Sequence, residues 1–128
     1  GDLSKAEAPV VRVMSADILR DTIGVKQEGS QSWSTQHSLA RINDEGAGVL
    51  VILGGVNVEG IEQRLENFFG ESSSMQPSGT GAYLTVGTGS QILRDLGVTK
   101  MRLLNPEVKY SALSGFDLEV VEFIPYND

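Results

Sequence analysis

Residues 91–104 specify a helix, its end and the following strand within one short segment. The helical part has apolar residues spaced to lie on one face, and Gly97 follows where a left-handed residue commonly ends a helix. Val98 is then placed to pack back against that helix, and residues 100–104 are predicted to form a strand. A helix joined so closely to a strand indicates a layered α/β domain. The apolar face is predicted to consist of Ile92, Leu93 and Leu96.

Strand and helix patterns alternate along the rest of the chain. The continuous apolar run of residues 48–53 is bounded by glycines and predicts a strand that is covered on both faces and central in its sheet. The alternation indicates a single domain over residues 1–128, an α/β layered domain with a mostly parallel central sheet flanked by helices, in which residues 1–8 are a linker or a frayed N-terminus. Other extended segments are expected at residues 9–14, 82–86, 100–104 and 118–124, and helices at residues 33–44, 58–69, 89–96 and 105–114.

The helix at residues 33–44 is expected to use Ser32 as its N-cap and to end at Gly46. On a helical wheel, Arg41 and Glu45 point away from the apolar arc. Two polar stretches rich in glycine and serine are expected to be loops, at residues 15–32 and 71–81. The arc that faces the core is predicted to consist of Leu39, Ala40 and Ile42.

Composition excludes several classes of function. The chain has no cysteine, which removes disulfides and thiolate catalysis, and His37 is its one imidazole, so neither a metal site nor another cofactor is expected. A net charge of −7 disfavours extended contact with nucleic acid. Apolar runs fall short of the roughly 20 residues that a membrane span needs, and the polar start lacks the pattern of a secretion signal. We therefore expect a cytoplasmic protein without nucleic-acid or membrane partners.

The C-terminal third resembles a known enzyme family. Residues 89–97 read Gly-Ser-Gln-Ile-Leu-Arg-Asp-Leu-Gly, Asn105 and Pro106 follow a strand, and residues 115–123 read Gly-Phe-Asp-Leu-Glu-Val-Val-Glu-Phe. This order is similar to that of GTP cyclohydrolase II, the enzyme that opens riboflavin synthesis. The resemblance continues more weakly upstream, in residues 9–15 and in the Glu-Gly-Ala-Gly-Val-Leu-Val of residues 45–51. It implies the fold of that family for the whole chain.

The resemblance also implies a catalytic site that this sequence does not contain. Family members bind zinc through three cysteines, and the residues nearest those positions are Asp17, Glu28 and Ser30. The family's acid/base aspartate and its nucleophilic arginine fall on Ala82 and Leu84, neither of which can transfer a proton or attack phosphorus. Its arginine-containing nucleotide segment is replaced by residues 52–60. No catalytic residue is therefore predicted.

A cluster of glycines before the helix at residues 89–96 leaves two interpretations open. Backbone amides at the start of a helix can hold a phosphate, which makes Gly87, Gly89 and Ser90 candidates. Lys109 is a further candidate, because it matches a lysine of the family if a gap is allowed. The alternative is that these glycines are turn residues inherited with the scaffold.

Two functions follow from the resemblance. The first is a catalytically degenerate GTP cyclohydrolase II-like domain of a riboflavin-biosynthesis protein, fused behind an N-terminal 3,4-dihydroxy-2-butanone 4-phosphate synthase domain and acting as an interaction or regulatory module. The second is a non-catalytic sensor that binds GTP, GDP or a flavin nucleotide. A homodimer is the expected assembly, since the family is commonly dimeric.

Overall fold

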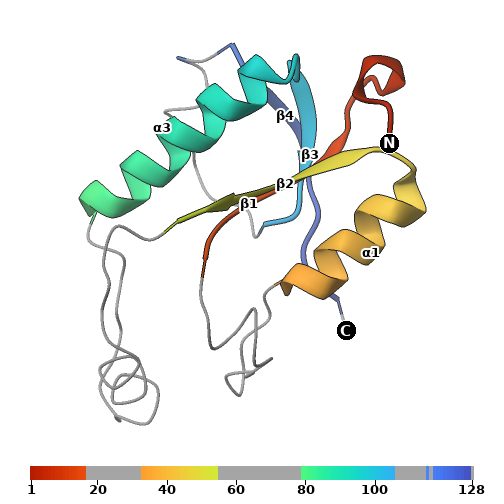
Figure 1. The fold of residues 1–128 in the computed structure, drawn as a ribbon, viewed down its shortest axis with the longest axis horizontal. Coiled ribbons are helices and arrows are strands. Elements are labelled where there is room, and N and C mark those ends of the chain that lie inside the picture. The colour runs from red at the N-terminus through yellow and green to blue at the C-terminus, as the bar shows by residue number, and fades with distance from the viewer. Residues whose placement is uncertain (17–32, 55–78, 106–114, 116, 128) are drawn as a thin grey trace, which may run out of the picture.

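The computed structural model describes residues 1–16, 33–54, 79–105, 115 and 117–127. These residues form an α/β domain in which helices lie on both sides of a parallel sheet (Figure 1), as the sequence predicts. The elements in chain order are the 3-10 helix η1 (Leu3–Lys5), β1 (Val10–Ser15), α1 (Thr35–Glu45), β2 (Gly48–Leu53), α3 (Gly79–Asp95), β3 (Lys100–Leu103) and β4 (Glu119–Phe123).

The sheet has the order β2-β1-β3-β4, and every neighbouring pair is parallel. β1 pairs with β2 in register from Val10 opposite Gly48 to Ser15 opposite Leu53. The prediction that residues 48–53 form a central strand is wrong, because β2 lies at the edge of the described sheet. A continuous apolar run indicates that both faces of a strand are covered, and helices lie on both faces of this sheet. Such a run does not indicate whether another strand pairs with each edge of the strand.

The two faces of the sheet differ in chemistry. Under α3, alternate strand residues form the apolar core with Leu93 of the helix. On the opposite face, under α1, the strands present Arg12 and Arg102, and the fully buried residue of α1 is Ser38. Stability therefore comes mainly from the α3 face. The apolar core consists of Val11, Val51, Leu93, Val98, Met101, Leu103 and Leu118.

Helix α1 begins and packs differently from the prediction. Ser34, rather than Ser32, is its N-cap, with Oγ accepting from the amide of His37 at 3.2 Å. Leu39 is 51% exposed and Ala40 is also exposed, so only Ile42 of the predicted arc is partly covered. The helix ends at Gly46, as predicted, with a φ of +82°. The apolar arc of α1 does not predict which of its residues are buried, because the sheet face beneath this helix is partly polar.

Helix α3 is longer than predicted. Residues 79–81 were expected in a loop and residues 82–86 in extended structure, but both stretches are helical. Glycine and β-branched residues lower the helix propensity of this stretch, and tertiary context commonly overrides propensity. Residues 89–96 are helical as predicted, up to Asp95.

The end of α3 agrees closely with the sequence prediction. Gly97 has a φ of +82° and its amide donates to the carbonyl of Arg94 at 2.9 Å. The amide of Val98 donates to the carbonyl of Leu93 at 3.0 Å, and both of these side chains are buried. The predicted inward face is only partly correct, because Ile92 and Leu96 are exposed on a flank of the helix.

Other predictions fall on ends of the chain or on residues that are not described. Within residues 1–8 the structure contains η1, capped by the side chain of Asp2, whose Oδ1 accepts from the amide of Ser4 at 3.0 Å. The predicted helix at residues 58–69 lies outside the described residues, as do residues 106–114 of the helix predicted at 105–114, residues 17–32 of the loop predicted at 15–32 and residues 71–78 of the loop predicted at 71–81. No helix in the described part of the chain has the length and apolar character that crossing a membrane requires.

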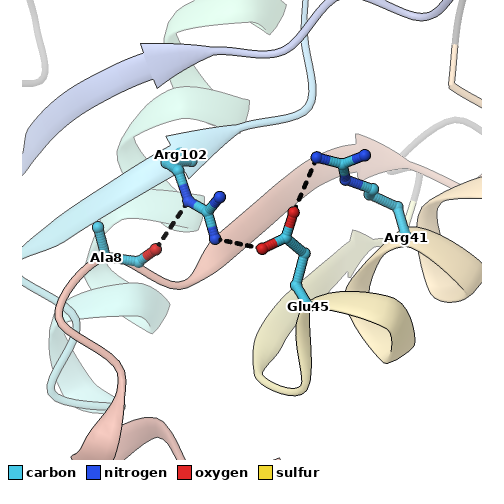
Figure 2. A network of polar contacts seen from close by, with 4 residues as sticks. All are labelled: Ala8, Arg41, Glu45 and Arg102. Atoms are coloured by element: carbon cyan, nitrogen blue, oxygen red, sulfur yellow. Dashed lines mark hydrogen bonds and ion pairs between the residues drawn. The ribbon is translucent and has the colours of Figure 1, made fainter.

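A charged network ties α1 to β3 (Figure 2). Glu45, in the last turn of α1, contacts Arg102 of β3 and Arg41 of its own helix, both at 2.8 Å. Arg102 also donates from Nε to the carbonyl of Ala8 at 3.1 Å. The hydrogen bond from Arg102 holds the pKa of Glu45 below its ordinary value. The helical wheel places Arg41 and Glu45 away from the apolar arc, and the structure shows that this side of α1 faces Arg102 of β3 through Glu45 rather than solvent alone.

Replacing Glu45 with glutamine removes the carboxylate that both arginines contact. We expect E45Q to lower the free energy of unfolding near neutral pH by about 1 kcal/mol. Because folding lowers the pKa of Glu45, its contribution is complete above the ordinary value of 4.5 and is lost as the pH falls through the folded-state value. Urea unfolding at several pH values should show the difference between E45Q and the wild type shrinking in acid. The exposed neighbour Asp44 provides the control, D44N, which should change stability little at any pH.

Candidate functional site

The carboxyl edge of the sheet is the first place to look for a site. Strands of a parallel sheet end at the same edge, and open α/β sheets bind ligands there. β1, β2 and β3 end at this edge at Ser15, Leu53 and Leu103. The described polar residues that converge near it include Arg12 of β1 and Asn105, which follows β3.

Arg12 acts as a clamp between three segments. Its Nη1 donates to the carbonyl of Leu104 at 2.9 Å and also contacts the side-chain oxygen of Asn105. Its Nη2 lies 3.4 Å from the carbonyl of Trp33, just before α1. Arg12 is only 9% exposed, so these donors work in a largely dry environment. The guanidinium thus fixes the start of α1 and the end of β3 relative to β1.

The chemistry that the described residues offer at this edge is limited. A guanidinium turned toward carbonyl and amide oxygens positions backbone but supplies neither a nucleophile nor a proton acceptor. The described residues contain no group of three or more histidine, cysteine, aspartate or glutamate side chains that could hold a metal ion. Asp17, Glu28 and Ser30, the candidates nearest a zinc site, lie outside the described residues.

An aromatic cluster beside the clamp attaches the C-terminal tail. Trp33 donates from Nε1 to the carbonyl of Ile124 at 2.8 Å and packs edge-on against Tyr126, with ring centroids 5.2 Å apart. His37 Nδ1 lies 3.2 Å from the hydroxyl of Tyr126 and 3.0 Å from that of Ser34. This cluster was not predictable from sequence patterns, because Tyr126 is 89 positions away from His37. Its contacts hold the tail against the start of α1.

The phosphate candidates do not lie at a helix start. Gly87, Gly89 and Ser90 are in the interior of α3, about two turns or more beyond its first residue. A Cβ added to Gly89 would lie 2.8 Å from Cγ1 of Val13, so this glycine allows α3 to approach β1 closely. The geometric basis for a phosphate cradle, amides left open at a helix N-terminus, is therefore missing at these residues. Lys109 lies outside the described residues.

An open depression lies at the other end of α3. It is lined by residues of the last helical turns and of the approach to β4. Arg94 and Asp117 form an ion pair across it at 2.7 Å, with both side chains substantially exposed. Such a pair contributes little energy and leaves no enclosed volume for a ligand. The lining residues are Gln91, Arg94, Asp95, Gly115 and Asp117.

Comparison with known proteins identifies the scaffold. The family model of GTP cyclohydrolase II matches residues 1–125. The chain belongs to the GTP cyclohydrolase II family. The resemblance drawn from residues 89–97 and 115–123 is thereby confirmed, and the parallel α/β sheet is consistent with that fold.

Relatives of this GTP cyclohydrolase II family domain are proteins of riboflavin biosynthesis. The chain is 42% identical over 127 residues to "3,4-dihydroxy-2-butanone 4-phosphate synthase" of Pseudomonas aeruginosa and 38% identical over 127 residues to the protein of the same name in Pseudomonas syringae pv. tomato. It is 36% identical over 135 residues to "Riboflavin biosynthesis protein RibBA" of Bacillus cereus. These matches cover 98% of the chain but 34% of each relative, so the chain spans about a third of their length.

Two glycines of α3 provide a matched test of this helix. We expect Gly89→Ala to lower the free energy of unfolding by about 1–2 kcal/mol, because the new methyl meets the stiff side chain of Val13. Gly87→Ala, with no atom within 4 Å of the added Cβ, should raise it by about 0.5–1 kcal/mol. Urea unfolding measures both. Equal effects of the two substitutions would contradict the close approach of α3 to β1.

Proposed function

We propose that this chain is a catalytically degenerate GTP cyclohydrolase II-like domain, which serves as an interaction or regulatory module of a riboflavin-biosynthesis protein. The observation that carries the proposal is the absence of cysteine from a chain of this family. Without thiolates, the three-cysteine zinc site implied by the family resemblance cannot form.

The residues in place of those cysteines do not fit zinc of that kind. Asp17, Glu28 and Ser30 offer two carboxylates and a hydroxyl, which are harder ligands suited to other metals. A hydroxyl is also a poor zinc ligand beside thiolate or imidazole. The ligand chemistry therefore disagrees with a retained zinc centre, and no reaction step is assigned through one.

Other parts of the family's site are also replaced. Ala82 and Leu84 stand where the resemblance places an acid/base carboxylate and a nucleophilic arginine, and neither side chain has a reactive group. Residues 52–60 contain no arginine in the stretch that corresponds to the nucleotide-contacting segment. The missing groups act in different steps of one reaction, so a single compensating residue would not restore it.

The scaffold itself is well formed, which supports a role that depends on shape. The amides of Gly97 and Val98 donate to carbonyls in the last turn of helix α3, the core under this helix is apolar, and the Arg12 clamp is largely buried. The length of the relatives named as synthases also leaves room for a synthase domain in the same protein. A module that binds or regulates such a domain needs a stable surface but no catalytic group. Its proposed assembly is a homodimer.

The proposal predicts that the purified protein contains well under one equivalent of zinc and releases no formate from GTP. Elemental analysis and a formate assay measure the two properties. A matched variant with Asp17→Cys, Glu28→Cys and Ser30→Cys should take up about one equivalent of zinc while remaining inactive, because Ala82 and Leu84 are unchanged. The double variant Asp17→Ser, Glu28→Ser, which already has Ser30 at the third position, is the control and should stay free of zinc. Stoichiometric zinc in the wild type, or formate release, would overturn the proposal.

Nucleotide titration separates the proposed module from the alternative, a sensor of GTP, GDP or flavin nucleotides. We expect none of these ligands to raise the unfolding midpoint, because the arginines of the nucleotide segment are absent. A ligand at 100 times its Kd stabilises a folded protein by about 2.7 kcal/mol, which thermal unfolding detects readily. A saturable upward shift with one nucleotide would favour the sensor instead.

A further inference from the structure

The outer side of β2 presents backbone groups that no described residue pairs with. The carbonyl of Leu53 accepts from the amide of Ala16 at 2.8 Å, so Leu53 and the alternate residues Val49 and Val51 turn their backbone groups toward β1. The backbone groups of the intervening residues, Gly48, Leu50 and Ile52, consequently point away from the sheet. Outward amides and carbonyls of this kind are a template for another strand.

The two edges of the described sheet are built differently. β4 carries Glu119 and Glu122, and its register with β3 is broken by an irregularity opposite Met101 and Arg102. Charge and bulges are the devices that protect an edge from pairing with another chain. β2 has the sequence Gly-Val-Leu-Val-Ile-Leu and a regular register, with no charged residue and no proline. Of the two edges of the described sheet, β4 therefore has features that hinder pairing with another strand, and β2 has none of them.

Exposed apolar side chains lie on the same side of the molecule as β2. In α1, His37 contacts Tyr126 of the C-terminal tail and Arg41 belongs to the network with β3, so that flank faces β3 and β4. Leu39 is on the opposite flank and is 51% exposed. Ile52 of β2, on the sheet face that α1 covers, is 49% exposed.

Helix α3 extends this surface on the other face of the sheet. Arg94 pairs with Asp117, which comes shortly before β4, so its flank of the helix faces β4. Ile92 and Leu96, spaced at i and i+4, occupy the opposite flank and are exposed. Apolar side chains from both helices therefore flank the unprotected strand.

We propose that β2 pairs antiparallel with β2 of a second copy of this chain across a two-fold axis. Centred on Leu50, the pairing sets Gly48 opposite Ile52 of the partner subunit and Val49 opposite Val51 of the partner subunit. A large residue then meets a small one at each end, and every outward backbone group of the strand gains a partner. The strand is uncharged in a chain of net charge −7, so no like charges meet in this register.

The size of this side of the molecule suits a dimer. The 6 residues of β2 span about 20 Å, and a helix about 10 Å across lies on either face of the sheet (Figure 1). The resulting surface of roughly 600 Å² approaches the ~800 Å² per partner of a standard interface. Strand pairing alone would cover only part of this area, so contact by the flanking apolar residues is required as well.

Sedimentation of the whole chain over a range of concentrations tests the pairing. Ile52→Lys places an edge charge on an already exposed residue and should raise the dimer dissociation constant at least tenfold. Val121→Lys, on β4, is matched in chemistry and exposure at 47% and should leave the constant unchanged. Circular dichroism confirms that both variants fold. A monomeric wild type, or equal effects of the two lysines, would overturn the proposal.

Amide hydrogen exchange gives a second readout that does not require a variant. Protection of the outward amides of Leu50 and Ile52 should rise with protein concentration, whereas that of Val51, which faces β1, should not. Concentration-independent exchange at Leu50 and Ile52 in a dimeric protein would place the interface elsewhere and overturn the proposal. The pairing rests on the homodimer of the proposed function, so a monomeric wild type would overturn both. A dimer in which Ile52→Lys and Val121→Lys have equal effects would overturn the pairing alone, and zinc content or formate release tests the proposed loss of activity separately.

Discussion

The structure depends on the burial of β1 between two parallel neighbours. Val11 of β1 accepts a hydrogen bond from the amide of Leu104, and Pro9, just before the strand, accepts one from Arg102 of β3. Ala16, just beyond its end, donates to Leu53 of β2. Val10 and Val11 are fully buried, and both helices of the described structure pack over this strand. Because a parallel strand cannot pair with its neighbour through a tight turn, each pairing of β1 fixes the two ends of a long connection. β1 thereby sets the position of every other element.

The two faces of the sheet, on either side of β1, contribute differently to the fold: one is an apolar core and the other contains buried arginines. Under α3, the apolar core supplies most of the free energy of burial. Under α1, Arg12 and Arg102 must be desolvated, and they recover that cost through carbonyl oxygens and the carboxylate of Glu45. Directional contacts of this kind define angles and register better than apolar contacts do. The polar face thus specifies how α1 and the tail sit on a sheet that the apolar face stabilises.

Local features of the fold were predictable from the sequence and relations between distant segments were not. Gly46 and Gly97 end their helices as predicted because a left-handed stop is encoded by adjacent residues. The edge position of β2 was missed, since the order of strands depends on connections rather than on the strand itself. Ser38 is buried in place of Leu39, and its Oγ donates to the carbonyl of Ser34 at 2.7 Å. The flank of α1 that faces the sheet is set by contacts with distant residues, such as that of Glu45 with Arg102.

For the candidate site, too, the sequence predicts local features but not contacts between distant residues. The missing chemical groups could be read directly, because an absent cysteine needs no structure to be recognised. The Arg12 clamp could not be found, since it joins Arg12 to residues 21 and 93 positions away. The helix-start argument for Gly87, Gly89 and Ser90 does not apply for a local reason, because α3 begins well before them in a stretch of weak helix formers.

The proposed loss of the reaction does not require a loss of the fold, because the core and the positions that the resemblance assigns to catalysis are different residues. The core under α3 consists of aliphatic side chains from the strands and from the helix end. The positions that the resemblance assigns to zinc follow β1 in the chain, outside these strands, so replacing thiolates there removes no core contact of the described residues. This differs from small zinc domains, in which the metal supplies the folding free energy. Because no core residue under α3 is one of the groups that the resemblance assigns to catalysis, the stability of this core places no requirement on those groups, and the proposed pairing through β2 does not depend on them either.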